Sequence, residues 1–333
     1  MNKLCKGRLW RFALVAGLAL AGGAAAMAPG VAQAAYPDKP VTLVVPGPPG
    51  GITDQVGRLV AARMTEQFGV RVVVDNKPGA GGNLATEAVA RAQPDGYTIL
   101  MGTQGTMATN QFLYKALRFD TARDFIPVHG LVAIPNILVL NSTRPIQSVK
   151  ELVAYAKANP GKLTVSSAGN GTGTHLAAEL FQTQAGVKFV HVPYKGSAPS
   201  VNDLLGGQVD LTFDYPVSTL AHVQSGRLRA LAVTGTSRLP QLPQVPTIAE
   251  AGYPGAESSS WIGLFFPAKT PAAMVSLWEA DLTAMLADKG MTEAIVKMGA
   301  VPMPQGGERF AEYVKAERVK WKGIIQRSGA TLD

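Results

Sequence analysis

A short apolar strand that runs into a turn of prolines and glycines constrains the fold of this chain most. Residues 41–45 are almost continuously apolar, as in a strand that is buried on both faces of a parallel sheet. Prolines within 46–49 end the strand because they lack an N–H to donate, and glycines at 50–51 leave their backbone N–H groups uncovered. Thr53 or Asp54 can then cap a helix that runs to about residue 67. The N-terminus of such a helix predicts an anion site, although a purely structural turn fits the same residues.

The first 34 residues predict a leader that is removed from the mature chain. Lysines and arginines precede an apolar stretch at 12–27, and Ala32-Gln33-Ala34 fits the small-residue cleavage rule. This stretch is too short and too rich in alanine and glycine for a membrane span, and no later stretch approaches the ~18 apolar residues of a span. Cys5, the only cysteine, lies before the apolar stretch, whereas a lipoprotein cysteine would follow it. We therefore expect a periplasmic chain without a lipid anchor or a disulfide.

The charge balance and the motifs narrow the function. The leader holds four of the 31 basic residues and none of the 23 acidic ones, which leaves 27 against 23 and a net charge of +4. That surface is too weakly basic to predict nucleic-acid binding. The sequence has no G-x-S-x-G elbow, P-loop, zinc-spaced histidine pair or calcium loop. We expect no metal, no cofactor and no catalytic residue, and an exported hydrolase is the rival interpretation.

Strands and helices alternate along the rest of the chain. A strand at 70–75, a glycine-rich turn at 76–82, a helix at 83–92 and a strand at 97–102 predict a parallel, doubly wound sheet. Extended apolar pieces from 124 to 141, broken by Pro127 and Pro135, suit strands that cross into a second lobe.

A second series of the same kind follows. The predicted elements are a helix at 149–158 with a Ser148–Glu151 capping box, a strand at 163–167, a glycine turn at 168–174, a helix from 175 to about 185, a strand at 189–194, a short helix at 200–205, and strands at 209–214 and 228–234. The linker-like stretch 237–257 returns the chain to the first lobe, where a strand at 261–267 precedes a helix opened by Thr270 and Pro271 and a last helix at 306–326. We predict a leader at 1–34, a first lobe at 35–135 plus 258–333, and a second lobe at 136–257.

Each lobe thus offers a glycine turn at a helix N-terminus, and the two turns can form a cleft that closes on a small anion. Neither turn carries an arginine or lysine. Backbone N–H groups, helix dipoles, bridging waters and hydroxyls such as those of Thr53, Ser167, Thr172 and Thr174 would therefore meet the charge. We expect Trp261 in the core, and His129, His191 and His222 in structural or surface roles.

Motifs along nearly all of the mature chain resemble those of the Bug-type solute-binding proteins of tripartite tricarboxylate transporters. In chain order they are Tyr36-Pro37 with the stretch from Val45 to Asp54, Asn76-Lys77-Pro78-Gly79-Ala80-Gly81-Gly82, Pro94-Asp95-Gly96-Tyr97-Thr98, Asp124-Phe125, Pro160-Gly161-Lys162-Leu163, His191-Val192-Pro193-Tyr194-Lys195-Gly196, Leu231-Ala232-Val233-Thr234, Val245-Pro246-Thr247 and Glu250-Ala251-Gly252. One departure is Gly47, where the family commonly has an aromatic residue. The mouth of the first turn can therefore be wider.

The resemblance implies an α/β fold of the type II periplasmic binding protein class, with two doubly wound lobes joined by crossing strands around a ligand cleft. It implies a carboxylate ligand, held by Gly50, Gly51, Ile52 and Thr53 of the first turn and by Ser167, Ala168, Gly169, Thr172, Thr174 and His175 of the second. Asp214 stands where amine- or amide-bearing ligands are met in some relatives. The implied partner is a membrane permease of a tripartite transporter, and a monomer suits the class. A periplasmic sensor that reports to a membrane signalling partner is the alternative.

Overall fold

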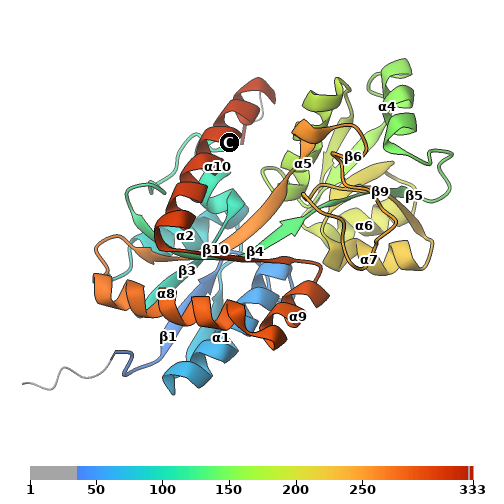
Figure 1. Ribbon diagram of the computed structural model, residues 1–333. Helices are drawn as coiled ribbons and strands as arrows, with labels where there is room; N and C mark the ends of the chain where they lie inside the picture. The colour runs from blue at the N-terminus through green and yellow to red at the C-terminus, as the bar shows by residue number, and fades with distance from the viewer. Residues whose placement is uncertain (1–35, 329–330, 333) are drawn as a thin grey trace, which may run out of the picture. The chain divides into compact units, whose positions relative to one another are not determined.

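The computed structural model describes residues 36–328 and 331–332. The predicted leader at 1–34, its cleavage site and Cys5 lie outside the described residues. The chain divides into a short N-terminal unit that ends at Asp38 and a unit that spans Lys39–Asp333. All that follows concerns the larger unit (Figure 1).

The strands of the described residues form two sheets, which define a first and a second lobe. In spatial order, the first sheet contains β11 (Val301–Gly306), β4 (Phe125–Pro135), β10 (Ser259–Pro267), β3 (Thr98–Thr103), β1 (Val41–Val45) and β2 (Val72–Asn76). The second contains β7 (Val190–Pro193), β6 (Thr164–Ser167), β8 (Leu211–Asp214), β5 (Ile137–Asn141) and β9 (Leu228–Val233).

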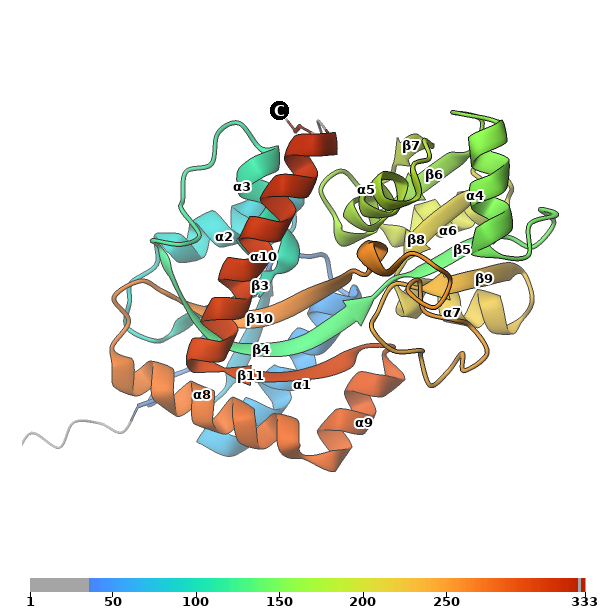
Figure 2. The same cartoon turned by 45° about the horizontal axis from the view of Figure 1, so that its top comes forward.

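Helices cover both faces of each sheet, as a doubly wound lobe requires (Figures 1 and 2). Around the first sheet lie α1 (Ile52–Phe68), the 3-10 turn η1 (Ala80–Gly82), α2 (Asn83–Ala90), the π-helical segment η2 (Gly105–Thr109), α3 (Asn110–Leu113), α8 (Ala272–Ala287), α9 (Lys289–Lys297) and α10 (Gly307–Ser328). Around the second lie α4 (Val149–Ala158), α5 (Gly173–Ala185), α6 (Ser197–Leu205), α7 (Pro216–Gln224) and the 3-10 turn η3 (Pro254–Ala256). Figure 2 shows α1 and α8 on one side of the first sheet and α2 and α10 on the other.

The predicted parallel unit is confirmed for β1, β2 and β3, because β1 pairs in parallel with both of its neighbours. The complete sheets are mixed, which the strand pattern did not indicate. β10 runs antiparallel to β3 and β4, and β5 runs antiparallel to β8 and β9. The reason is the path of the chain: β4 leads out of the first lobe and β10 leads back, so these neighbours must run in opposite directions.

The core of the second lobe shows why its central strand reads as continuously apolar. Leu138 and Leu140 of β5 pack with α4 and α5, whereas Ile137 and Val139 pack with α6. Alternate side chains of a strand point to opposite faces, so a strand covered on both sides must be apolar at every position. The same rule explains the run at 41–45 in β1, where Val41, Leu43 and Val45 are fully buried and Val44 is nearly so.

The ends of several elements test the capping predictions. Ser148 does cap α4, since its Oγ accepts the Glu151 N–H at 3.2 Å. Thr270 does not cap α8: its hydroxyl donates to the Pro267 carbonyl, and Pro271 precedes the first helical residue instead of occupying it. Pro127 does not break β4, which continues through it.

Strand β11, helices α7 and α9 and the π-helical segment were not predicted. In the described part of the chain, no helix is both long enough and apolar enough to cross a membrane. The proposed lobe limits at 35–135 plus 258–333 and at 136–257 stay a prediction.

Candidate functional site

The first turn links β1 to α1 and is held by a carboxylate. Gly50 has a positive φ of 82°, a conformation that glycine adopts without strain, and Gly51 is the N-cap of α1. Thr53 and Asp54 were predicted as alternative caps, but both lie inside the first helical turn. The Asp54 Oδ2 atom accepts the Gly50 N–H at 2.8 Å and the Arg58 Nε–H at 2.9 Å.

Asn76 stabilises the other end of this turn by hydrogen bonds. Its Nδ2 donates to the Gly47 carbonyl at 3.0 Å, and its Oδ1 accepts a longer hydrogen bond from Arg58 at 3.4 Å. Burial opposes ionisation of Asp54, but the hydrogen bonds from Arg58 and Gly50 and the Arg58 charge outweigh it and lower the pKa of the carboxyl. The first turn is therefore stabilised by a carboxylate that stays charged at neutral pH.

The second turn links β6 to α5 and is held by neutral groups. Gly169 and Gly171 have positive φ values of 136° and 75°. The Thr174 Oγ1 accepts the Ala168 N–H at 2.8 Å, and the Thr172 Oγ1 donates to the Gly169 carbonyl at 2.6 Å. The two threonine hydroxyls lie 2.8 Å apart. Because the Thr172 proton is used, Thr174 is the donor between them.

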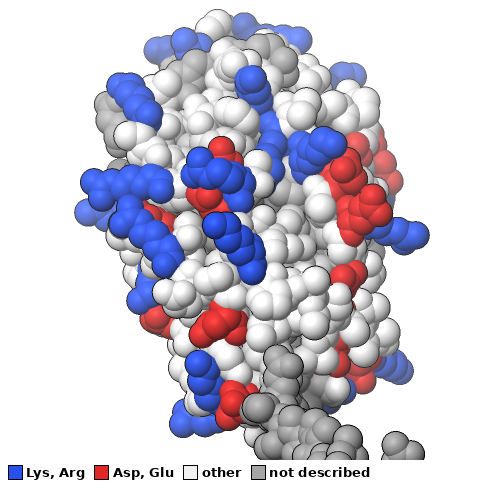
Figure 3. Space-filling view, turned by 90° about the vertical axis from the view of Figure 1, so that its left-hand side faces the viewer, with Lys and Arg blue, Asp and Glu red and all other residues white. Residues whose placement is uncertain are grey.

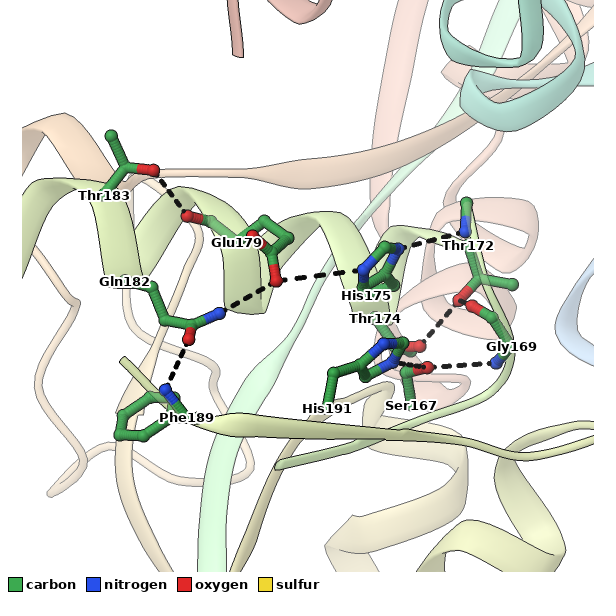
Figure 4. Close-up of polar contacts among 11 residues, drawn as sticks. Ser167, Gly169, Thr172, Thr174, His175, Glu179, Gln182, Thr183, Phe189 and His191 are labelled. Carbon is green, nitrogen blue, oxygen red and sulfur yellow. Dashed lines mark hydrogen bonds and ion pairs between the residues drawn. The ribbon is translucent and has the colours of Figure 1, made fainter. Parts of the chain in front are cut away.

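A pair of stacked imidazoles contacts this turn (Figure 4). The rings of His175 and His191 are 4.1 Å apart and nearly parallel. The His175 Nδ1 accepts the Gly171 N–H at 3.1 Å, so its proton is on Nε2, which faces Glu179 at 3.8 Å. The His191 Nε2 lies 2.7 Å from the Ser167 Oγ, which in turn accepts the Gly169 N–H at 3.2 Å.

Burial keeps both imidazoles neutral. It lowers the pKa of His175 to about 3, with a smaller contribution from His191, and it also lowers the pKa of His191. Burial raises the pKa of the Glu179 carboxyl, against the hydrogen bond from Gln182. His191 thus has a structural role, as predicted from the sequence, and so has His129, which is buried between Gly130 and Thr283.

Both turns contribute to one cavity of about 690 Å³. Of the predicted site residues, Ile52, Thr53, Ala168 and Thr172 line it. Gly50, Gly51, Ser167, Gly169, Thr174, His175 and Asp214 are not among its lining residues; most of these build the turns that position the lining ones. The further lining residues are Pro46, Pro48, 78–82, 103–105, Ile134, Gly171, Gly173, Lys195, Gly196, Tyr215 and 260–262. The ligand-binding role of the predicted residues stays a prediction.

Asp214 lies at the end of β8 and is fully buried. Its Oδ1 accepts hydrogen bonds from the Ser197 hydroxyl at 2.6 Å and from the Tyr215 N–H at 2.7 Å. Its Oδ2 has no partner among the described residues. Burial raises the pKa of this carboxyl to about 6, although both hydrogen bonds act in the opposite direction.

Sequence reasoning missed several polar residues of the cavity: Gln104, Lys195, Tyr215 and Ser260. Gln104 directly follows β3, so it lies at the same sheet edge as the first turn, and this position was the signal that could have found it. Lys195 belongs to the family motif at 191–196, but nothing in that motif shows that the loop after β7 reaches the cavity. Trp261 is fully buried in the core, as expected, and also borders the cavity.

Two other features of the surface carry less information. A cavity of about 610 Å³ at the outer edge of β9 contains none of the predicted site residues. Basic and acidic side chains are interspersed on the face that Figure 3 shows, with uncharged stretches between them. Among the described residues, no cluster of three or more histidine, cysteine, aspartate or glutamate side chains could hold a metal ion.

Comparisons with known proteins agree with this architecture. Residues 56–330 match the model of the tripartite tricarboxylate transporter family receptor. Protein BugT of Bordetella pertussis is 35% identical over 309 residues, which cover 92% of this chain and 95% of that protein.

Two solved structures show the same fold. The R. palustris protein Rpa4515, solved with adipate, is 39% identical with a TM-score of 0.82, and the match covers 88% of this chain and 98% of that one. The periplasmic binding protein BugD is 38% identical with a TM-score of 0.79, covering 89% and 99%. The two-lobed periplasmic binding protein fold is thereby confirmed. The chain belongs to the family of tripartite tricarboxylate transporter receptors.

Proposed function

We propose that this chain is a periplasmic solute receptor that captures a small carboxylate-bearing ligand between its lobes and delivers it to a membrane transporter of the tripartite tricarboxylate type. One observation carries the proposal. The N-terminal turns of α1 and α5, one from each lobe, line a single cavity, and none of the described lining residues is an aspartate or glutamate. A helix N-terminus favours an anion, and a cavity without carboxylates does not repel one.

Closure of the lobes follows from the same arrangement. A ligand that contacts Thr53 and Thr172 at once touches both lobes, so it binds the closed form better than the open form and shifts the population toward it. Each helix N-terminus contributes only ~0.3–1 kcal/mol when exposed, and micromolar affinity requires about −8 kcal/mol. Several groups must therefore converge on the ligand, as the lining of this cavity allows.

The ligand is identified by a thermal-shift screen of the mature chain, from Ala35, against small carboxylates and their neutral analogues. A ligand at ~100 times its dissociation constant adds ~2.7 kcal/mol to the free energy of unfolding, which raises Tm by several degrees. We expect stabilisation by one or a few acids without turnover. If no acid binds and mass spectrometry finds no copurified acid, the carboxylate proposal fails.

Two variants test the site. Thr174→Val removes the hydroxyl that orders Ala168 and Thr172, and Gly51→Val adds bulk beside Ile52 and Thr53. We expect each to raise Kd about tenfold while the protein stays folded. Thr183→Val, also on α5 but exposed, is the control for loss of a threonine hydroxyl. Unchanged affinity in both site variants would contradict the assignment.

The transport step is tested separately in cells. Uptake of the identified acid should be lost when the gene is deleted, restored by the wild-type gene, and restored poorly by Thr174→Val. Normal uptake in the deletion strain would instead favour a sensor role for the loaded protein.

A further inference from the structure

Gln104 presents a buried hydrogen-bond donor that the described residues leave unpaired. The residue is only 3% exposed, it lines the cavity, and its Nε2 has no hydrogen-bond partner among the residues that the structure describes. An unpaired buried amide destabilises the folded protein, and such a group is retained where a ligand completes the hydrogen bond. Gln104 also begins the helical segment after β3, so its backbone fixes it at the sheet edge that carries the first turn.

Lys195 supplies the charge that both turns lack. It lies in the loop between β7 and α6 of the second lobe and lines the same cavity. Among the described lining residues, it is the only lysine or arginine, and no aspartate or glutamate accompanies it. No ion pair or hydrogen bond of the Lys195 ammonium group is found in the described part of the chain. Its charge is therefore available to a ligand.

We propose that Gln104 and Lys195 form a second polar subsite, distinct from the two turns, which makes the receptor selective for dicarboxylates. This inference rests on the proposed function. The helix N-termini hold one carboxylate by N–H groups and hydroxyls, and the Gln104 amide and the Lys195 ammonium group hold the other. Since Gln104 belongs to the first lobe and Lys195 to the second, the second carboxylate also bridges the lobes.

The proposal makes selectivity depend on the second negative charge. The test compares succinate, glutarate and adipate with butyrate, pentanoate and hexanoate, which have the same lengths and one carboxylate fewer. Isothermal titration of the wild-type protein should show at least one diacid that binds about tenfold to hundredfold more tightly than its matched monoacid. Equal binding of diacids and monoacids overturns this inference and leaves the proposed function intact, whereas binding of no acid overturns both.

Lys195→Met removes the charge and keeps most of the length of the side chain. We expect it to weaken binding of the preferred diacid about tenfold to hundredfold and to change binding of the matched monoacid about twofold or less. Lys188→Met, an exposed lysine of the same lobe outside the cavity, should change neither. An equal loss for both acids, or no loss for either, contradicts the proposed role of Lys195.

Gln104→Leu adds a readout that a structural glutamine would not give. Because the Gln104 Nε2 donates to none of the described protein groups, this change should leave Tm of the ligand-free protein unchanged or raise it, while diacid affinity falls about tenfold. Gln111→Leu, on α3 and outside the cavity, is the matched control. A lower Tm without a loss of diacid affinity would show that Gln104 serves the fold and would overturn the subsite.

Discussion

The two turns that face the cavity have the same backbone design and different supports. In the first, a carboxylate and a guanidinium, Asp54 and Arg58, hold Gly50, and Arg58 is 57% exposed. In the second, hydroxyls and neutral imidazoles hold the backbone, and Thr174 and His175 are buried. Interactions of exposed charges are screened by salt, whereas buried neutral networks are disrupted by protonation.

Because of this difference, we expect the two turns to respond to different solution conditions. Lowering the pH from 7 to 5 does not reach the Asp54 carboxyl, whose pKa is already below its usual range. The same change crosses the ordinary pKa of histidine, at which the unfolded chain takes up a proton and buried His175 does not. The first turn should therefore respond to salt and the second to acid.

The largest effect on ligand binding should come from a substitution in the second turn, which is packed more closely than the first. A Cβ at Gly173 would meet Ser260 of β10 and would lie 2.7 Å from the Tyr215 hydroxyl, whereas a Cβ at Gly51 meets only the Pro48 carbonyl at 3.4 Å. Gly173→Ala must displace Ser260, at a cost of about 1–3 kcal/mol, and should weaken ligand binding about tenfold to hundredfold. Gly51→Ala should change Kd less than about threefold.

Titration calorimetry of both variants checks the contrast between Gly173 and Gly51. Gly206→Ala, at the end of α6 with ordinary contacts, is the control for the loss of a glycine. A Gly51→Ala defect as large as that of Gly173→Ala would mean that the two turns are packed alike.

Acid should weaken the second lobe through His175. Its pKa is about 3 when folded and about 6.5 when unfolded, so the unfolded state binds the extra proton between these values. The contribution of neutral His175 to the free energy of unfolding is fully present above pH 6.5. It decreases as the pH is lowered toward 3, with a loss of about 2 kcal/mol at pH 5. His175→Asn keeps an acceptor for the Gly171 N–H but cannot titrate, so it should lose less.

Urea unfolding at pH 7, 6 and 5 measures this difference in the free energy of unfolding. His222→Asn, at a half-buried histidine on α7, should stay closer to the wild type than His175→Asn does. Equal acid losses for His175→Asn and wild type would remove His175 as the cause.

Asp214 should partly offset the acid sensitivity. Its pKa is raised from about 3.8 to about 6 in the folded state, so the folded chain keeps a proton that the unfolded chain has lost. This carboxyl therefore lowers the free energy of unfolding as the pH rises from 3.8 through 6. Acidification from pH 7 to 5 accordingly raises the free energy of unfolding by about 1 kcal/mol through this group. Asp214→Asn should make the acid loss steeper by that amount. An unchanged slope in urea unfolding would contradict it.

The parts of the fold and of the candidate site that could be predicted from the sequence are those whose structure depends on neighbouring residues in the chain. The turns at 46–54 and 167–175 were predictable because an apolar strand, bare glycines and a helix follow each other in sequence. Strand β11 was missed because Pro302 and Pro304 resemble loop residues. Proline is tolerated there because β11 is an edge strand, which among the described strands pairs only with β4. Pro127 is tolerated in β4 for a related reason: β11 pairs with β4 only from His129 onward.

The composition of the site was less predictable than the turns. Gln104 and Lys195 lie 91 positions apart in different lobes and meet the same cavity only after both sheets have formed. Neither has a local pattern that distinguishes it from the other glutamines and lysines of the chain. The tendency of strand ends to gather at one sheet edge points to Gln104 but gives no orientation for its side chain.

The smallest effect should be that of Arg58 on the first turn. Arg58→Gln removes the charge beside Asp54 but leaves the Gly50 hydrogen bond to the carboxylate, so we expect only a small loss in the free energy of unfolding at low salt, typical of an ion pair with an exposed partner. At ~1 M salt, where the screening length is ~3 Å, the loss should nearly vanish. Urea midpoints of wild type and variant at both salt concentrations measure it, and Arg63→Gln on the same helix is the control. A salt-independent loss would mean that Arg58 acts through packing and its contact with Asn76, and the two turns would then differ in acid sensitivity alone.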